Sequence, residues 1–290
     1  MKIGANSFLW TETFTSKDFK ILDRLAAAGL NGIEIGLLEP STLPAKALRQ
    51  ALEERELACT MCCVIPRGAS LIASDSADRR RGQEHVIRCI DMAAEVGAGT
   101  LCGPLYSPVG QFTGERRTPE EWTRAVESWQ LLAPAAAACN VEIALEPLNR
   151  YETYFLNTVA DVVQLCIEID HPLVGVLVDT YHANIEEKSI ARAIQVASTR
   201  LHHIHSSESD RGTPGLGAVH WQEFFEALHA SGYNKWLTIE GFGFSLGALS
   251  AAASIWRDLA ASPDDIAFQG ASFLRNQLAV RRMDNDIKRR

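Results

Sequence analysis

The chain has 290 residues, of which 47% are hydrophobic and 22% are charged. This is the composition of a globular protein with a large core, and it excludes a disordered tail and a disulfide-stapled mini-domain. The formal net charge of -8 provides no broad basic surface, so a nucleic-acid partner is disfavoured.

Short apolar runs alternate with amphipathic stretches along the chain. The apolar runs predict eight strands, at residues 2–8, 32–36, 58–64, 100–103, 141–146, 174–179, 201–206 and 236–240. The amphipathic stretches predict helices at residues 16–28, 43–55, 78–96, 119–139, 159–169, 190–197, 221–230 and, closing the series, 246–259.

Repeated strand–helix units predict a parallel sheet, and eight of them predict a closed barrel. We therefore expect a single-domain α/β fold, a (β/α)8 TIM barrel with closing C-terminal helices over residues 1–282, followed by a polar tail at residues 283–290. A doubly wound open sheet is the alternative. It is disfavoured because residues 6–9 lack the glycine-rich turn that usually follows the first strand of such a sheet.

The first residues lead directly into a predicted strand without an apolar signal segment. The most apolar helical stretch is interrupted by Pro134 and Glu142, which a membrane span would not carry. We therefore expect a cytoplasmic enzyme with no membrane partner. The seven cysteines are an odd number spread through apolar segments, which is typical of reduced core thiols, and we interpret Cys59 and Cys62 in this way despite their Cys-x-x-Cys spacing.

The last four predicted strands each end in a side chain that can bind a metal. These residues are Glu146, Asp179, His205 and Glu240. Because the carboxyl ends of barrel strands meet at one rim, we expect three carboxylates and one imidazole to lie together there. Their mutual repulsion would be relieved by a divalent cation, and this ligand set suits Mn²⁺, Mg²⁺ or Co²⁺. Any one of the four alone is explained by chance or by capping of the next helix.

More polar side chains follow these strand ends in the predicted loops at the same rim. They are Arg150, Glu152, His182, Glu208 and Arg211. We expect them to contact the hydroxyls of a polyol, with a local salt bridge as the alternative for Arg150, Glu152 and Glu208. On the seventh strand, alternation places His203 on the same inward face as His205 and turns His202 outward.

Three stretches resemble the ketose 3-epimerase group of the xylose-isomerase-like barrel superfamily. They are residues 144–150 (ALEPLNR), 178–187 (VDTYHANIEE) and 203–209 (HIHSSES), within a likeness that extends from Gly4 to about Leu274. The resemblance implies metal-dependent epimerisation of a small-molecule ketose at C3. It also implies the same four metal ligands that the strand ends predict.

The resemblance further implies substrate contacts at Glu152, His182 and Arg211, with Cys63 near the sugar. The loop after the first strand departs from the group's usual pattern, and its Phe8 and Trp10 predict an apolar end of the pocket. L-Ribulose, D-psicose, D-fructose and D-tagatose therefore all stay open as substrates. We expect Mn²⁺ as the ion, with Co²⁺ or Mg²⁺ as alternatives. The resemblance implies a homodimer or homotetramer.

Epimerisation removes a proton from one face of C3 and returns one to the other, which requires two acid–base groups. Glu146 and Glu240, on strands three units apart, are the candidates. The first alternative is an aldose–ketose or hydroxypyruvate-type isomerase that uses the same ligands. An apurinic-endonuclease-like nuclease is disfavoured by the negative net charge, and a sugar-binding protein without catalysis is the remaining alternative.

Overall fold

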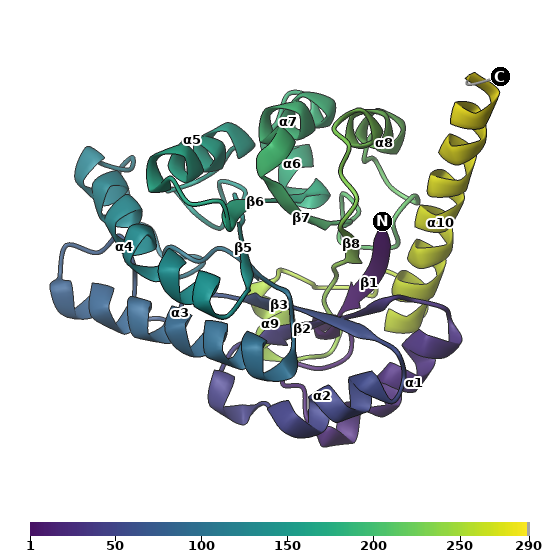
Figure 1. Cartoon of the computed structure of the whole chain (residues 1–290), viewed down its shortest axis with the longest axis horizontal. Coiled ribbons are helices and arrows are strands. Elements are labelled where there is room, and N and C mark those ends of the chain that lie inside the picture. The colour runs from purple at the N-terminus through teal and green to yellow at the C-terminus, as the bar shows by residue number, and fades with distance from the viewer. Residues whose placement is uncertain (289–290) are drawn as a thin grey trace.

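The computed structural model describes residues 1–288, and the side chains of residues 1–280. Eight parallel strands pair in chain order and close into a barrel through pairing of the first strand with the last, as Figure 1 shows. The strands are β1 (Lys2–Asn6), β2 (Gly32–Leu37), β3 (Ala58–Cys63), β4 (Thr100–Gly103), β5 (Glu142–Leu145), β6 (Val174–Asp179), β7 (Leu201–His205) and β8 (Trp236–Ile239). The predicted single-domain barrel is confirmed.

Helices cover the outside of the barrel. The longer ones are α1 (Lys20–Ala27), α2 (Ala45–Glu53), α3 (Ser76–Val96), α4 (Pro119–Ala138), α5 (Val159–Ile169), α7 (Ile190–Ala197), α8 (Trp221–Ala230) and α10 (Pro263–Lys288). The shorter ones are α6 (Thr180–Glu186), α9 (Ala248–Ala252), η1 (Ser7–Leu9), η2 (Ser16–Asp18), η3 (Pro40–Thr42) and η4 (Ser198–Arg200). Helices α4 and α5 each have a threonine at the N-cap. Thr118 and Thr158 form capping boxes with Glu121 and Asp161, respectively.

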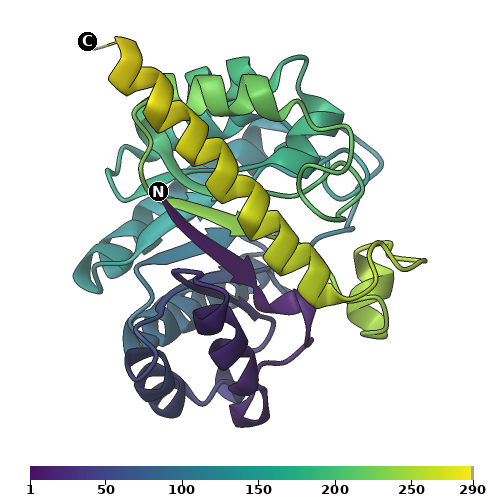
Figure 2. The same ribbon diagram turned by 90° about the vertical axis from the view of Figure 1, so that its right-hand side faces the viewer.

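The predicted closing helix at residues 246–259 is wrong. Only the short α9 forms there, and it ends before Ser254, whose φ of 57° is incompatible with a continuing helix. The long closing helix is α10, which begins at Pro263, a position where the missing backbone N–H is tolerated. Helix α10 packs across β1 and β8, as Figure 2 shows. Its bounds include most of the predicted polar tail at residues 283–290, whose side chains lie outside the described residues.

Two kinds of core fill the fold. Between the strands and the helices lies a continuous apolar core. Inside the barrel a small apolar cluster is formed by Cys62, Cys102, Ala144 and Leu177. Buried polar side chains share the interior with it, and include Asn6, Glu34, Thr60, His203, His205 and Thr238. The barrel interior is thus arranged to hold charged groups out of water.

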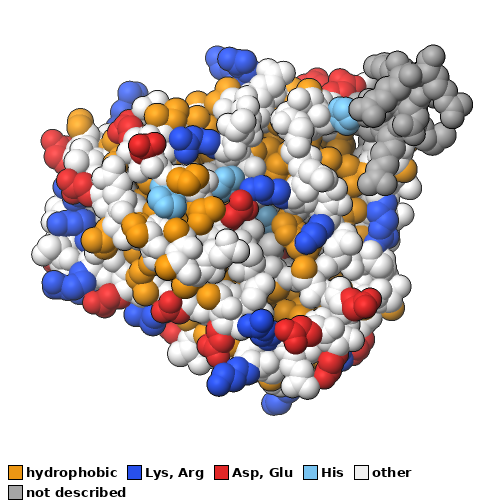
Figure 3. All heavy atoms as spheres, in the orientation of Figure 1, with side chains coloured by type: hydrophobic (Ala, Val, Ile, Leu, Met, Phe, Trp, Pro, Cys, Tyr) orange, Lys and Arg blue, Asp and Glu red, His pale blue; other side chains and the backbone are white. Residues whose placement is uncertain are grey.

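No described helix is long and apolar enough to cross a membrane. Figure 3 shows one face, on which Lys and Arg side chains are scattered among acidic ones. Within the described part of the chain all seven cysteines are free thiols, and every one except Cys139 is buried. The interpretation of the cysteines as reduced thiols of the core agrees with this arrangement.

Candidate active site

The four side chains predicted from the strand ends meet at the carboxyl-terminal rim of the barrel. Asp179 and His205 are the last residues of β6 and β7, and Glu146 and Glu240 directly follow β5 and β8. All four are buried, and one ligand atom from each lies within 4.8 Å of the others. We call this group the rim site.

Asp179 serves two purposes because its two oxygens face different neighbours. Its Oδ1 accepts a hydrogen bond from the Tyr181 backbone N–H at 2.8 Å and so caps helix α6. Its Oδ2 faces the rim site. The cap begins the helix that brings His182 back over the site.

The rim site contains polar atoms that nothing in the described protein satisfies. Glu146 Oε1 and His205 Nδ1 are buried without hydrogen-bond partners, and they lie 3.7 Å apart. Glu240 Oε1 lies 3.3 Å from the same His205 nitrogen. Three carboxylates and one imidazole are ligands for a hard or borderline divalent cation, so the residues fit such an ion.

Arg211 balances part of this negative charge. Its Nη1 lies 2.6 Å from Asp179 Oδ2 and also forms an ion pair with Glu240. The guanidinium stacks on the ring of Tyr181, with its carbon 4.1 Å from the ring centroid. The same carbon lies 5.3 Å from the ring centroid of Phe242. Its backbone φ of 65° is unusual for a residue other than glycine and is typical of functional positions.

Burial and charge shift the pKa values of the carboxyls in opposite directions. Burial raises the pKa of Asp179 to about 6 and that of Glu146 well above its ordinary value, with Glu240 and Asp179 adding to the rise at Glu146. Burial also acts to raise the pKa of Glu240, but His205 and Arg211 outweigh it and lower that pKa to about 2. Two neighbouring carboxyls with separated pKa values are typical of acid–base pairs.

His182 and Glu152 are both held by Asn149, through its backbone N–H and its side-chain amide respectively. The Nδ1 of His182 accepts a hydrogen bond from the Asn149 backbone N–H at 3.1 Å, which leaves Nε2 to carry the ring proton. That nitrogen lies 3.7 Å from both Glu146 and Asp179, and 3.1 Å from Arg211 Nη2. The Asn149 amide donates to Glu152 Oε1 at 2.8 Å. Burial lowers the pKa of His182 and raises that of Glu152.

A cavity opens above the rim site and has a polar floor and an apolar wall. The floor is formed by Glu146, Glu152, His182, Arg211 and Glu240. The wall includes Phe8, Val64, Leu148, Phe242 and Leu249. Phe8 stacks on Phe242 with ring centroids 5.9 Å apart. The Phe8 ring fits there because Gly36 has no side chain; a Cβ at this position would lie only 2.3 Å from the ring. The cavity can therefore hold a small polyhydroxylated molecule by one end.

Two of the predicted substrate contacts lie away from the cavity. Cys62 lines the wall, whereas Cys63 is the next residue along β3, points to the opposite face and adjoins Cys89 of α3. Trp10 also faces elsewhere, since its Nε1 donates to Asp264 of α10 at 2.6 Å.

Two other loop residues are engaged in local contacts. Arg150 is exposed and pairs with Glu186 at 2.9 Å. Glu208 accepts hydrogen bonds from the backbone N–H groups of Gly215 and Val219 and from the indole of Trp221, and so holds its own loop together. These contacts agree with the alternative of a local structural role for both residues.

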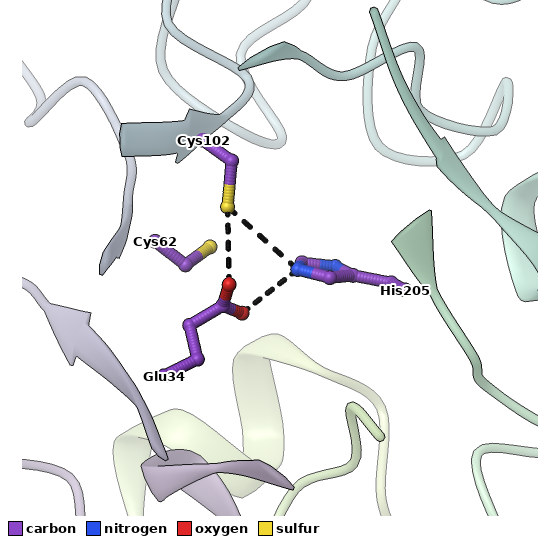
Figure 4. Close-up of side chains that lie close together, drawn as sticks. All are labelled: Glu34, Cys62, Cys102 and His205. Atoms are coloured by element: carbon purple, nitrogen blue, oxygen red, sulfur yellow. Dashed lines mark hydrogen bonds and ion pairs between the residues drawn. The ribbon is translucent and has the colours of Figure 1, made fainter. Parts of the chain in front are cut away.

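Sequence reasoning missed a second polar group beneath the rim site. Glu34 of β2 is fully buried, and its carboxylate contacts both His203 and His205. Figure 4 shows it converging with Cys62, Cys102 and His205 from four different strands. The available signal was a lone acidic residue in the middle of an apolar strand, GIEIGL.

Comparison with known proteins places this geometry in context. The model of the xylose isomerase-like TIM barrel family matches residues 22–277. A probable ketose 3-epimerase of Synechocystis sp. is 34% identical, over 95% of this chain and 96% of that protein. A ketose 3-epimerase of Arthrobacter globiformis is 31% identical, over 97% of this chain and 98% of that protein. The crystal structure of a D-allulose 3-epimerase from Methylomonas sp. in complex with D-allulose has a TM-score of 0.91 and 29% identity, and the match covers 96% of this chain and 97% of that one.

Proposed function

The chain belongs to the ketose 3-epimerases of the xylose isomerase-like TIM barrel family, and from that premise we propose that it epimerises a free ketose at C3 with the rim site as its metal centre. Enzymes of this group are isomerases. The observation that carries the proposal is the meeting of Glu146, Asp179, His205 and Glu240 within 4.8 Å, with Glu146 and Glu240 lining the floor of a cavity.

These four residues would hold the divalent ion, with Mn²⁺ as the first choice and Co²⁺ or Mg²⁺ as alternatives. The bound ion supplies Lewis-acid chemistry, which makes the C3 proton of a 2-ketose more acidic. The two unpartnered atoms, Glu146 Oε1 and His205 Nδ1, support this assignment because a buried polar atom without a partner is costly.

The chain's own acid–base groups are Glu146 and Glu240. They stand at the ends of strands three units apart and both line the cavity floor, so a sugar bound between them presents one face of C3 to each. One carboxylate takes the C3 proton and leaves an enediolate. The other carboxyl group then donates a proton to the opposite face, which inverts the configuration. The two residues exchange roles in the reverse reaction.

The remaining polar residues of the floor orient the sugar. His182 directs its Nε2 proton toward the cavity, and Arg211 presents a guanidinium fixed by stacking, so both can bind the O1 and O2 oxygens. Glu152, held by Asn149, accepts from a hydroxyl on the same side. Phe8 and its apolar neighbours exclude water from the reacting carbon.

The experiment is incubation of the protein with Mn²⁺ in D₂O and a panel of four ketoses: L-ribulose, D-psicose, D-fructose and D-tagatose. We expect deuterium at C3 of a ketose product, read by NMR. An aldose labelled at C1 or C2 would identify an isomerase instead, and no label in any sugar would contradict the proposal. EDTA-treated protein is the control. Cytoplasmic location and a homodimeric or homotetrameric state stay predictions.

A further inference from the structure

Glu34 lies directly beneath the rim site, and the surrounding protein contacts both of its oxygens. Oε1 accepts a hydrogen bond from the Asn6 amide at 2.9 Å and lies 2.8 Å from His205 Nε2. Oε2 accepts from the Thr60 hydroxyl at 2.9 Å and from the Cys102 thiol, and it lies 2.8 Å from His203 Nε2. The protein itself therefore provides partners for both oxygens of this buried carboxylate.

The group in Figure 4 consists of ligand types that also bind metals, so a second ion site must be considered. Ligand atoms lie about 2.0–2.2 Å from a bound transition-metal ion, so two of them at a right angle are about 3 Å apart. Glu34 Oε1 and His205 Nε2 are closer than that, at a distance typical of a charge-assisted hydrogen bond. The Cys102 thiol donates to Glu34 Oε2 at 3.4 Å. The group is therefore held together by hydrogen bonds and ion pairs.

This contact has a consequence for the imidazole of His205. Its Nε2 faces Glu34, and its Nδ1 faces Glu146 and Glu240. A carboxylate only accepts hydrogen bonds, and a cation bound at the rim site would take up the carboxylates of Glu146 and Glu240 that face Nδ1. In the metal-bound protein the ring proton would therefore stay on Nε2, toward Glu34, and the lone pair of the neutral ring would be on Nδ1. The ring plane is also fixed, because Glu34 is itself anchored by Asn6 and Thr60 on two other strands.

We propose that Glu34 is a positioning residue that fixes the tautomer and orientation of His205, so that Nδ1 presents its lone pair to a divalent cation. The inference rests on the proposed metal centre and adds to it a residue on the opposite side of the barrel, from β2. Carboxylates that accept the second N–H of a metal-binding histidine typically affect metal affinity by about 10–100-fold.

The test compares Glu34→Gln with Thr60→Val. The glutamine keeps the size of the side chain but has one accepting oxygen and no charge, so it cannot replace both oxygens of the carboxylate. Thr60→Val removes one donor to Glu34 and leaves the contact between Oε1 and His205 intact. Binding of Mn²⁺ to protein stripped of metal is followed by the electron paramagnetic resonance signal of free Mn²⁺. We expect Glu34→Gln to weaken binding by about tenfold and Thr60→Val by less than about threefold.

A second measurement uses the unaltered protein, so it does not depend on a variant that binds metal weakly. In protein with ¹⁵N-labelled histidine and diamagnetic Mg²⁺, the His205 resonances should be those of a ring protonated at Nε2. The proposal is overturned if the proton is on Nδ1, or if Glu34→Gln weakens Mn²⁺ binding by less than about fivefold. If the unaltered protein binds neither Mn²⁺ nor Mg²⁺, the proposed metal centre fails, and this outcome is distinct from a loss seen only in Glu34→Gln.

Discussion

Glu34 and Glu146 are both buried carboxylates inside one barrel, and they differ in what reaches them. Three hydrogen-bond donors and two histidines surround Glu34, whereas Glu146 Oε1 has no hydrogen-bond partner. Burial acts to raise both pKa values. At Glu34 the two histidines outweigh it and lower the pKa well below the ordinary value, while at Glu146 the pKa is raised well above it.

The difference separates a carboxylate that completes the protein's own structure from one that is prepared for a ligand. An unsatisfied buried acceptor costs stability, so it persists where something outside the chain completes it. The carboxylate of Glu34 is complete without any addition. The five predictions below test this contrast, beginning with the largest effect.

Replacing either glutamate of the proposed acid–base pair should nearly eliminate turnover. In Glu146→Gln and in Glu240→Gln, one face of C3 loses its proton acceptor, and loss of a general base typically costs about 10²–10⁴-fold in rate. The measurement is ketose epimerisation followed by NMR. Glu142→Gln is the matched control, because Glu142 begins β5 far from the rim and pairs with Lys235. A wild-type rate in either rim variant would contradict the two-base scheme.

A glutamate-to-glutamine substitution should change the free energy of unfolding in opposite directions at Glu146 and at Glu34. In protein stripped of metal, Glu146→Gln should raise the free energy of unfolding, since it removes a carboxyl that lacks a partner. Glu34→Gln should lower it by about 1–3 kcal/mol, because donors lose their acceptor. Urea denaturation followed by circular dichroism measures both values. Shifts of the same sign would contradict the contrast between a carboxylate with hydrogen-bond partners and one without them.

Metal affinity should fall as the pH falls below about 6. The pKa of Asp179 is raised from 3.8 to about 6, so below that pH a proton must leave before the carboxylate can bind an ion. Well below pH 6 each pH unit costs about tenfold, but near the pKa the loss is smaller, so Mn²⁺ should bind about fivefold more weakly at pH 5 than at pH 6. A pH-independent affinity between these values would count against Asp179 as a ligand.

The raised pKa of Asp179 also makes the stability of the metal-free protein depend on pH. Between pH 4 and 6 the folded chain holds a proton that the unfolded chain has released. This carboxyl therefore lowers the free energy of unfolding as the pH rises through that window. Urea titrations at both pH values, compared with Asp179→Asn, isolate the contribution.

The smallest effect is expected at Arg150, on the outer surface of the same rim. Its guanidinium pairs with Glu186 rather than facing the cavity. Arg150→Ala should therefore change kcat/KM by less than about twofold, as is typical of exposed ion pairs. Arg211→Ala, which removes a guanidinium from the cavity floor, is the contrasting variant and should lower kcat/KM strongly.

The barrel and the rim site were predictable from the sequence. The barrel follows from the period of the apolar residues, and the rim site follows from the position of polar residues at the strand ends. Apolar runs marked every strand, and the ends of four predicted strands carried side chains that can bind a metal. Glu34 was not predicted because it lies in mid-strand, and its partners come from β1, β3 and β7. Only closure of the barrel brings these strands to one point.

Two errors arise from local conformation that the sequence pattern does not encode. Cys62 and Cys63 are both buried in β3, and the pleat alone decides which of them faces the cavity. The region around α9 is rich in alanine and looks helical, but the positive φ of Ser254 ends the helix and leaves closure to α10.

The pairing of β1 with β8 sets an order of events during synthesis on the ribosome. The barrel cannot close before the segment Trp236–Ile239 has emerged, and the ligand Glu240 directly follows it. The other three residues of the rim site are therefore translated before the strand that closes the ring. The rim site is completed only when the ring closes, so a chain truncated before β8 would retain three of the four residues without bringing all four together.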